Sequence, residues 1–225
     1  PFDYGFFVRR SRPSTVSEER ASVNRQPSTR NECPSGAAVR PPSTIFKKKY
    51  MELPTLESRR LDLRGIMKAD IDFIYELNSD PEVVKYVFKK EHTYEEAEAD
   101  LERYLSFPEK YQLPIGVWVA FELETAQPVG IFFLKKLEET GEIEIGYRLA
   151  KEHWNKGYAT EGSKELLEYA LNDLGITRIV AVTNPENIAS SHVLQKLGLL
   201  YEKTDAFYNE TCKYYGLTIG AAYFL

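Results

Sequence analysis

The sequence has few of the residues that build metal or disulfide sites. Its 225 residues include two cysteines, Cys33 and Cys212, and three widely separated histidines. Two cysteines exclude a disulfide-rich scaffold and a cysteine-rich zinc site. No His-x-x-x-His pair occurs, so a metal centre built from histidines is not indicated either. We therefore expect no resident metal.

Long hydrophobic runs are also missing. No stretch of about 18 apolar residues occurs, so the sequence predicts no transmembrane helix. The net charge of −5 is not typical of a nucleic-acid-binding protein. Hydrophobic residues make up 43% of the chain, which is enough for the core of one globular domain. We expect a cytoplasmic monomer or homodimer, with neither nucleic acid nor membrane as a partner.

The charge is unevenly distributed along the chain. Residues 1–50 hold ten Lys/Arg and four Asp/Glu, whereas residues 51–225 hold 19 Lys/Arg and 30 Asp/Glu. The first 50 residues also contain six of the 12 prolines and no periodic apolar pattern. We interpret residues 1–50 as a disordered extension and residues 51–225 as the folded domain. For the extension, a targeting peptide, a native tail and sequence upstream of a start at Met51 all remain open.

Hydrophobic periodicity predicts alternating sheet and helix after residue 55. Alternating or β-branched runs predict strands at 60–64, 115–123, 129–134, 142–149, 178–183, 199–204 and 212–219. Helical spacing predicts helices at 70–79, 94–105, 159–174 and 189–197, the second opened by a capping box of Thr93 and Glu96. Closely spaced strands before residue 150 indicate an antiparallel meander. The strand–helix–strand order after it indicates a parallel crossover, and thus a mixed α/β domain.

One segment has the composition of an anion site. Residues 153–163 read His-Trp-Asn-Lys-Gly-Tyr-Ala-Thr-Glu-Gly-Ser and lie between a predicted strand and a long predicted helix. A small residue such as Gly157 lets a ligand approach the backbone, and the first N–H groups of a helix attract phosphate. The segment matches neither G-x-G-x-x-G nor a Walker pattern. The alternative is that Gly157 is an ordinary linker glycine.

Several segments in order resemble the GNAT superfamily of acetyl-CoA-dependent N-acetyltransferases. They are residues 144–149, 154–161, 187–190 and 194–198, and residues 57–64, 80–83 and 127–130 are similar to the branch of ribosomal-protein alanine N-acetyltransferases (Rim type). The resemblance implies a mostly antiparallel sheet of six to seven strands, with one splayed parallel pair and about four flanking helices. It also implies that acetyl-CoA is the co-substrate and that a primary amine attacks its thioester directly. This amine belongs to a protein N-terminus or to a small molecule.

The same resemblance implies which residues contact the co-substrate. The family's phosphate-binding signature, Gln/Arg-x-x-Gly-x-Gly/Ala, falls on the segment that begins at Trp154, which lacks the charge of the family's arginine. A backbone N–H near Tyr147 is expected to face the thioester oxygen. The implied contact residues are Tyr147, Arg148, Leu149, Trp154, Asn155, Lys156, Gly157, Tyr158, Ala159, Thr160, Asn187 and Ser190.

Two side chains are candidates for proton transfer. The family often has a catalytic carboxylate on the strand at 142–149, and Glu144 is favoured over Glu142 as general base. A base that works near neutral pH needs a pKa raised by partial burial. Ser190 is the candidate acid for the leaving thiolate, because Leu194 stands where many members have a tyrosine.

Other interpretations remain beside these. Asn187 and Ser190 are also typical helix-capping residues, and both glutamates are also ordinary exposed strand residues. Tyr208, Tyr214 and Tyr215 are further candidates for an acceptor-pocket wall, with ordinary exposed strand tyrosines as the alternative. Tyr86 and Phe88 lie where the family's acceptor-binding loop falls, with core packing as the alternative. The alternative function is a non-catalytic GNAT-like module that senses acyl-CoA or binds a partner, and it is favoured by Trp154 in the position of the charged residue.

Overall fold

The computed structural model describes residues 52–88 and 90–220. Its strands are β1 (Leu56–Glu57), β2 (Leu61–Gly65), β3 (Val117–Glu122), β4 (Pro128–Lys136), β5 (Ile143–Leu149), β6 (Arg178–Thr183), β7 (Leu200–Phe207) and β8 (Glu210–Thr218). Its α-helices are α1 (Ile71–Ser79), α2 (Pro81–Val84), α3 (Tyr94–Tyr111), α4 (Tyr158–Glu168) and α5 (Ile188–Lys196). Short 3-10 turns span Lys68–Asp70 and Lys151–His153. The predicted extension at 1–50, with Cys33, lies outside the described residues.

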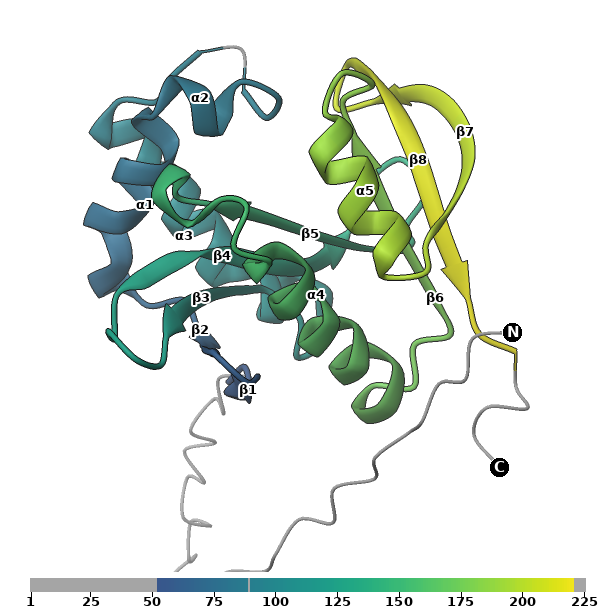
Figure 1. Ribbon diagram of the computed structural model, residues 1–225, viewed down its shortest axis with the longest axis horizontal. Coiled ribbons are helices and arrows are strands. Elements are labelled where there is room, and N and C mark those ends of the chain that lie inside the picture. Colours follow the sequence, from purple (N-terminus) through teal and green to yellow (C-terminus); the bar gives the residue numbers. More distant parts are fainter. Residues whose placement is uncertain (1–51, 89, 221–225) are drawn as a thin grey trace, which may run out of the picture. The chain divides into compact units, whose positions relative to one another are not determined.

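The strands form one mixed sheet in the order β1-β2-β3-β4-β5-β6-β8-β7 (Figure 1). Only β5 and β6 run parallel, and they pair at two positions, Ile143 with Ile179 and Glu144 with Val180. Beyond Glu144 the two strands diverge (Figure 1). The predicted mixed α/β fold with one splayed parallel pair is confirmed. The sheet has eight strands rather than six or seven, because the two-residue β1 adds an edge strand that is too short to show a sequence pattern.

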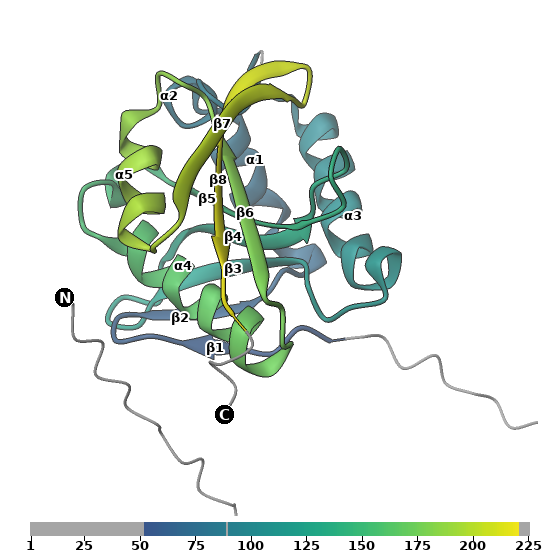
Figure 2. The same cartoon turned by 90° about the vertical axis from the view of Figure 1, so that its right-hand side faces the viewer.

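Helices cover both faces of the sheet. Figure 2 shows α4 and α5 on one side of the strands and α3 on the other. Alternating side chains of β4 and β5 define these faces, since Phe132 packs against Gly162 of α4 while Arg148 contacts Asn78 of α1 and Tyr104 of α3. The core lies between the layers. Cys212 is buried in a smaller cluster with Val180, Phe207 and Tyr214.

Helix α3 begins at the predicted capping box. The Thr93 hydroxyl accepts the Glu96 N–H at 3.3 Å, and the Glu96 carboxylate accepts the Thr93 N–H at 2.9 Å. The helix continues past the predicted end at residue 105 to Tyr111, although Pro108 lies inside it. Phe107 and Tyr111 are both buried, and burial of these aromatic rings outweighs the backbone bond that the proline removes.

Helix α4 is fixed against the sheet by a glycine. A Cβ atom on Gly162 would lie 2.4 Å from the Phe132 ring, so only glycine allows this close approach. The helix passes into a π-helical turn at Tyr169–Asp173 and is followed by Gly175 with φ of +63°. The helix predicted at 159–174 is therefore confirmed, and it ends in a π-helical turn before the left-handed Gly175.

Candidate active site

The divergence of β5 and β6 leaves part of β5 with one neighbour only. The Ala150 N–H donates to the Val129 carbonyl, and the Glu142 carbonyl accepts from the Leu137 N–H, so even-numbered residues direct their backbone groups toward β4. Successive residues of a strand alternate in this respect. Tyr147 and Leu149 therefore direct their backbone groups toward the gap that β6 has left.

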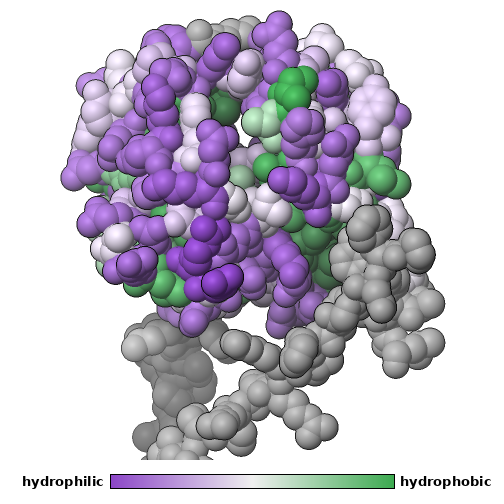
Figure 3. All heavy atoms as spheres, viewed as in Figure 1, coloured by the Kyte–Doolittle hydropathy of each residue, from purple (hydrophilic) through white to green (hydrophobic). Residues whose placement is uncertain are grey.

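The gap between β5 and β6 opens on the face of the molecule that Figure 1 shows. Figure 3, viewed as in Figure 1, shows a recess between the α2 side and the α5 side, with hydrophobic residues at its bottom and hydrophilic ones around it. The Leu149 carbonyl, on the gap side of β5, accepts the indole N–H of Trp154 at 2.9 Å. Trp154 is thus held beside the gap by its ring nitrogen, with 37% of its surface exposed.

The loop from Trp154 leads directly to the start of α4. Asn155 and Gly157 adopt left-handed conformations with φ of +58° and +85°. The first helical bond runs from the Glu161 N–H to the Gly157 carbonyl at 3.1 Å, and no side chain caps this helix start. The N–H groups from Tyr158 to Thr160 consequently have no intrahelical acceptor, which is the arrangement that binds phosphate.

The start of α5 lies beside Tyr147 on the α4–α5 face. The Asn187 side-chain oxygen accepts the Ser190 N–H at 3.0 Å, so the capping role weighed for Asn187 is present in the structure. Burial raises the pKa of the Tyr147 phenol, and the neighbouring Ser190 acts in the opposite direction. The structure therefore brings together the Ser190 side chain, the Tyr147 side chain and the free backbone edge of β5.

Glu144 lies on the opposite face of β5 in a group of three polar side chains. It is only 4% exposed, its carboxylate accepts a hydrogen bond from the Tyr208 phenol, and the Lys135 ammonium lies 3.2 Å away. Lys135 also donates to the Tyr208 oxygen at 2.6 Å. Burial raises the pKa of Glu144 although Lys135 and Tyr208 oppose this shift.

Tyr208 reaches this group from the turn between β7 and β8. Its φ is +54°, and 42% of its surface is exposed. Partial burial and the charge of Glu144 raise the pKa of the phenol, so it stays protonated at neutral pH. The structure therefore gives the buried carboxylate a neighbour that reaches solvent.

Glu142 is engaged elsewhere. Its carboxylate lies 3.1 Å from the Arg178 guanidinium and accepts a hydrogen bond from the Tyr214 phenol. Burial would raise the pKa of Glu142, but the bonds from Tyr214 and Arg178 outweigh it and hold the pKa below its usual value. A carboxylate kept charged by an arginine is a weak base, and Glu144 is the better candidate of the two.

Comparison with known proteins agrees with this geometry. Residues 60–200 match the Acetyltransferase (GNAT) domain, which is more than half of the chain. The chain belongs to the GNAT family. It is 32% identical to the FsC-acetyl coenzyme A-N(2)-transacetylase of Aspergillus fumigatus over 164 residues, covering 70% of this chain and 68% of that protein. It is 33% identical to the uncharacterized N-acetyltransferase p20 of Bacillus licheniformis over 159 residues, covering 67% and 89%.

Solved structures share the GNAT fold at lower identity. The ribosomal-protein-S5-alanine acetyltransferase from Vibrio fischeri aligns with a TM-score of 0.61 at 19% identity, covering 73% of this chain and 96% of that one. Such a likeness shows the fold alone. The predicted superfamily and the enzyme class, N-acetyltransferase, are confirmed by the relatives, whereas the Rim-type branch stays a prediction.

Arg148 lies on β5 beside the gap, but its polar groups point away from the gap. Its backbone faces β4, and its guanidinium donates to the Asn78 side chain at 2.7 Å and to the Tyr104 phenol at 3.1 Å. Asn78 in turn donates to Asp100 at 2.9 Å. This buried network ties β5 to α1 and α3.

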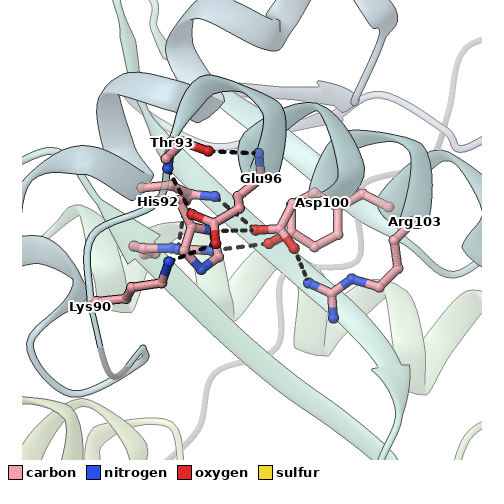
Figure 4. Close-up of polar contacts among 9 residues, drawn as sticks. Lys90, His92, Thr93, Glu96, Asp100 and Arg103 are labelled. Carbon is pink, nitrogen blue, oxygen red and sulfur yellow. Dashed lines mark hydrogen bonds and ion pairs between the residues drawn. The ribbon is translucent and has the colours of Figure 1, made fainter.

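The network extends to the start of α3 (Figure 4). His92 lies 3.1 Å from Asp100, and the Arg103 guanidinium lies 2.5 Å from the other carboxylate oxygen. Phe88 stacks on the His92 ring at 3.9 Å, and the Arg148 guanidinium lies 4.8 Å from the Phe88 ring centre. The packing role weighed for Phe88 is therefore present, on the same face of the sheet as Glu144.

Two further observations concern the part of the chain that the structure covers. No group of three His, Cys, Asp or Glu side chains is placed there to bind a metal ion. No helix among the described residues has the length and hydrophobicity needed to cross a membrane.

The sequence did not indicate one residue that lies next to the predicted phosphate-binding loop. The Arg60 guanidinium, from the turn between β1 and β2, pairs with Glu161 and also donates to the Lys156 carbonyl at 3.0 Å. Arg60 is about a hundred residues from this loop in the chain, and no local pattern connects the two.

Proposed function

We propose that this GNAT enzyme transfers the acetyl group of acetyl-CoA to a primary amine, and that the amine attacks the thioester directly. One observation carries the proposal: β5 has a free backbone edge at Tyr147 and Leu149, and this edge leads to the uncapped start of α4. A pantetheine arm has amide groups that pair with a strand edge, and a pyrophosphate suits free N–H groups. The contact residues are Tyr147, Leu149, those at 154–160, Asn187 and Ser190, whereas Arg148, expected from the sequence to be among them, directs its backbone toward β4 and its guanidinium to the other face.

The residues at the gap fit this co-substrate. The left-handed Gly157 has no Cβ atom to obstruct a phosphate, and Lys156 adds an exposed positive charge. Trp154 carries no charge, but its indole holds the last carbonyl of β5 and leaves the rest of the edge free. Backbone N–H groups therefore do most of the phosphate binding, as expected for a loop without the family's arginine.

Acetyl-CoA supplies an activated acetyl group as a thioester. The Tyr147 N–H stabilises the negative charge that develops on the thioester oxygen as the amine nitrogen bonds to the carbonyl carbon. The carbon–sulfur bond then breaks and the Ser190 hydroxyl donates its proton to the sulfur. The proton that the nitrogen must still lose to become an amide returns to the Ser190 oxygen, so the amide and the free thiol of CoA are left and Ser190 is unchanged. The Tyr147 phenol is buried on the same face of the sheet, beside Ser190.

Glu144 takes the proton that the acceptor ammonium must lose before it attacks. Since Glu144 is almost completely buried, the proton reaches it through Tyr208, whose phenol donates to the carboxylate and whose ring reaches the surface. The ammonium proton passes to the phenol oxygen while the phenol proton passes to Glu144, so Tyr208 is unchanged. Lys135 holds the Tyr208 oxygen in place.

The acceptor is a protein N-terminus or a small-molecule amine. The name of the Aspergillus relative describes transfer to a nitrogen atom, and the distant Vibrio relative is named for a protein alanine. The net negative charge of residues 51–225 favours a cationic amine over an anionic one.

Two measurements on the full chain test the proposal. Calorimetry with acetyl-CoA is expected to show binding, and its absence at millimolar ligand would remove the proposal. A thiol-release assay with a panel of amines and N-terminal peptides is expected to show turnover with at least one acceptor. Binding without thiol release above background would favour the acyl-CoA sensor instead.

A further inference from the structure

A clamp of three side chains holds the start of α4 from the side of β1 and β2. Glu161 accepts the Arg60 Nε–H at 2.8 Å, the Arg60 backbone N–H at 2.8 Å and the Ser58 hydroxyl at 2.8 Å. A second guanidinium nitrogen of Arg60 lies 2.6 Å from the same carboxylate. Such a paired contact between a guanidinium and a carboxylate fixes both partners in geometry.

The clamp also contacts the phosphate-binding loop directly. Arg60 donates to the Lys156 carbonyl at 3.0 Å, between the two left-handed residues Asn155 and Gly157. Its guanidinium lies 4.4 Å from the ring centre of Tyr158, the first residue of α4. Asparagine and glycine are residue types that adopt the left-handed conformation, and the bond to the carbonyl between them holds the loop in it.

The position of Glu161 is unfavourable for an anion site by itself. It is a negative charge in the first turn of the helix whose start faces the phosphates. Burial would raise the pKa of Glu161, but hydrogen bonds from Arg60 and Ser58 outweigh burial and keep it ionised. Among the described residues, Arg60 is the one cation in an ion pair with Glu161. Removal of Arg60 alone would therefore leave an uncompensated carboxylate beside the pyrophosphate.

We infer that Arg60 is a positioning residue for acetyl-CoA: it neutralises Glu161 and holds the Lys156 carbonyl, so that the loop keeps the conformation with free N–H groups. This inference rests on the proposed function. Arg60 thereby supplies, from another part of the chain, a positive charge near a loop whose first signature position is Trp154. It acts through Glu161 and the loop backbone rather than by contact with the reacting atoms.

A charge cycle tests the inference. Arg60→Gln is expected to raise the KM for acetyl-CoA about tenfold, with kcat at saturation within about twofold of wild type. Glu161→Gln is expected to leave this KM at or below the wild-type value. The double variant is expected to return to within about threefold of wild type, because it removes both charges. Lys164→Gln is the control, since it removes a cation from the same helix in an exposed pair with Glu168.

A shortened substrate shows which part of acetyl-CoA depends on the clamp for binding. S-acetyl-pantetheine lacks the pyrophosphate, so its KM is expected to be the same for wild type and Arg60→Gln. Salt near 1 M is expected to reduce the difference between the acetyl-CoA KM of wild type and that of Arg60→Gln, because it screens the charge of Glu161. Arg60→Lys retains the charge with a single donor group, and its KM is expected to lie between those of wild type and Arg60→Gln.

The outcomes separate the inference from the function on which it rests. A double variant as impaired as Arg60→Gln, or an equal effect on S-acetyl-pantetheine, would overturn the inference while acetyl-CoA binding stands. Wild type that binds no acetyl-CoA in calorimetry would overturn the proposed function and the inference together. Thermal unfolding of each variant reports folding, and Arg60→Lys replaces Arg60→Gln in the comparison if the latter does not fold.

Discussion

Glu144 is a carboxylate with almost no contact with solvent, and its neighbours decide what it does. If it accepts the ammonium proton, Glu144→Gln is expected to lower kcat about 100-fold, as usual for loss of a general base. Tyr208→Phe is expected to lower kcat about tenfold, because the proton path is interrupted while the carboxylate remains. Tyr201→Phe, which removes an exposed phenol bonded to Thr204, is the control. A normal kcat for Tyr208→Phe beside a low one for Glu144→Gln would leave Glu144 as base without the relay.

The raised pKa of Glu144 also predicts how activity depends on pH. If Glu144 is the general base, its carboxylate form is the active one, and this form is lost as pH falls through the raised pKa. The acid-side decline of kcat/KM is therefore expected above the pH at which an ordinary glutamate titrates. The decline is expected to disappear in Glu144→Gln, measured with an acceptor whose own pKa is known. An unchanged decline in that variant would assign it to another group.

The leaving-group side gives a separate residue-scale prediction. Ser190→Ala is expected to lower kcat about tenfold with little change in the KM for acetyl-CoA, because it removes a proton donor and keeps the backbone contacts. The capping bond from Asn187 uses the Ser190 N–H and survives the substitution. Unfolding temperature checks that α5 is intact. A kcat equal to that of wild type would mean that another group protonates the thiolate.

Sequence patterns place single residues on faces but do not find their partners. Alternation along β5 puts Glu144 and Arg148 on one face and Tyr147 on the other, as the structure has them. The partners of Glu144 come from β4 and from the turn after β7, more than sixty residues further on for Tyr208. No local pattern contains that distance information, and the same reason kept Arg60 out of the predicted site.

At the scale of elements, α4 is held by the contact between Gly162 and Phe132. Gly162→Ala is expected to destabilise the fold by about 1–3 kcal/mol, since overpacking exceeds the helix propensity gained. Phe132→Leu in the same chain is expected to restore part of that loss by making room for the methyl group. Urea unfolding of the two single variants and the double variant measures this. Equal stability of wild type and Gly162→Ala would show that the ring moves at no cost.

Element boundaries show which local signals are strong enough for prediction. The capping box at Thr93 marks the start of α3 correctly, because both of its bonds join residues three apart. The end of α3 is predicted six residues too early, because burial of Phe107 and Tyr111 depends on the sheet beneath them. β1 was not predicted, since its two residues pair with β2 through the backbone.

At the scale of the whole molecule, Arg178 ties together four neighbouring strand segments. It lies 3.1 Å from Glu142 beside β5 and 2.7 Å from Glu202 in β7, and it donates to the Thr218 hydroxyl of β8. The pKa values of both glutamates are lowered, chiefly by Arg178 for Glu202 and by Tyr214 and Arg178 against burial for Glu142. Their contribution to stability is complete above the ordinary glutamate pKa.

Acid should therefore weaken the fold in a defined direction. As pH falls from about 4.5 through the lowered pKa values, protonation of the two glutamates removes the contribution. Urea midpoints measured from pH 7 to pH 3 are expected to fall in this window, and to fall less steeply for Arg178→Gln. Parallel curves for the two proteins would show that other carboxylates control the acid limb.

Because β5 and β6 pair at two positions, few backbone hydrogen bonds join the two parts of the sheet on either side of them. A bound pantetheine arm would supply hydrogen bonds to β5 where β6 has diverged. Amide exchange at Tyr147 and Leu149 is then expected to slow on addition of CoA, by far more than in the centre of β3. Release of CoA at the end of each catalytic cycle would then remove the pantetheine arm from the gap. The gap between β5 and β6 would alternate between a filled and an empty state.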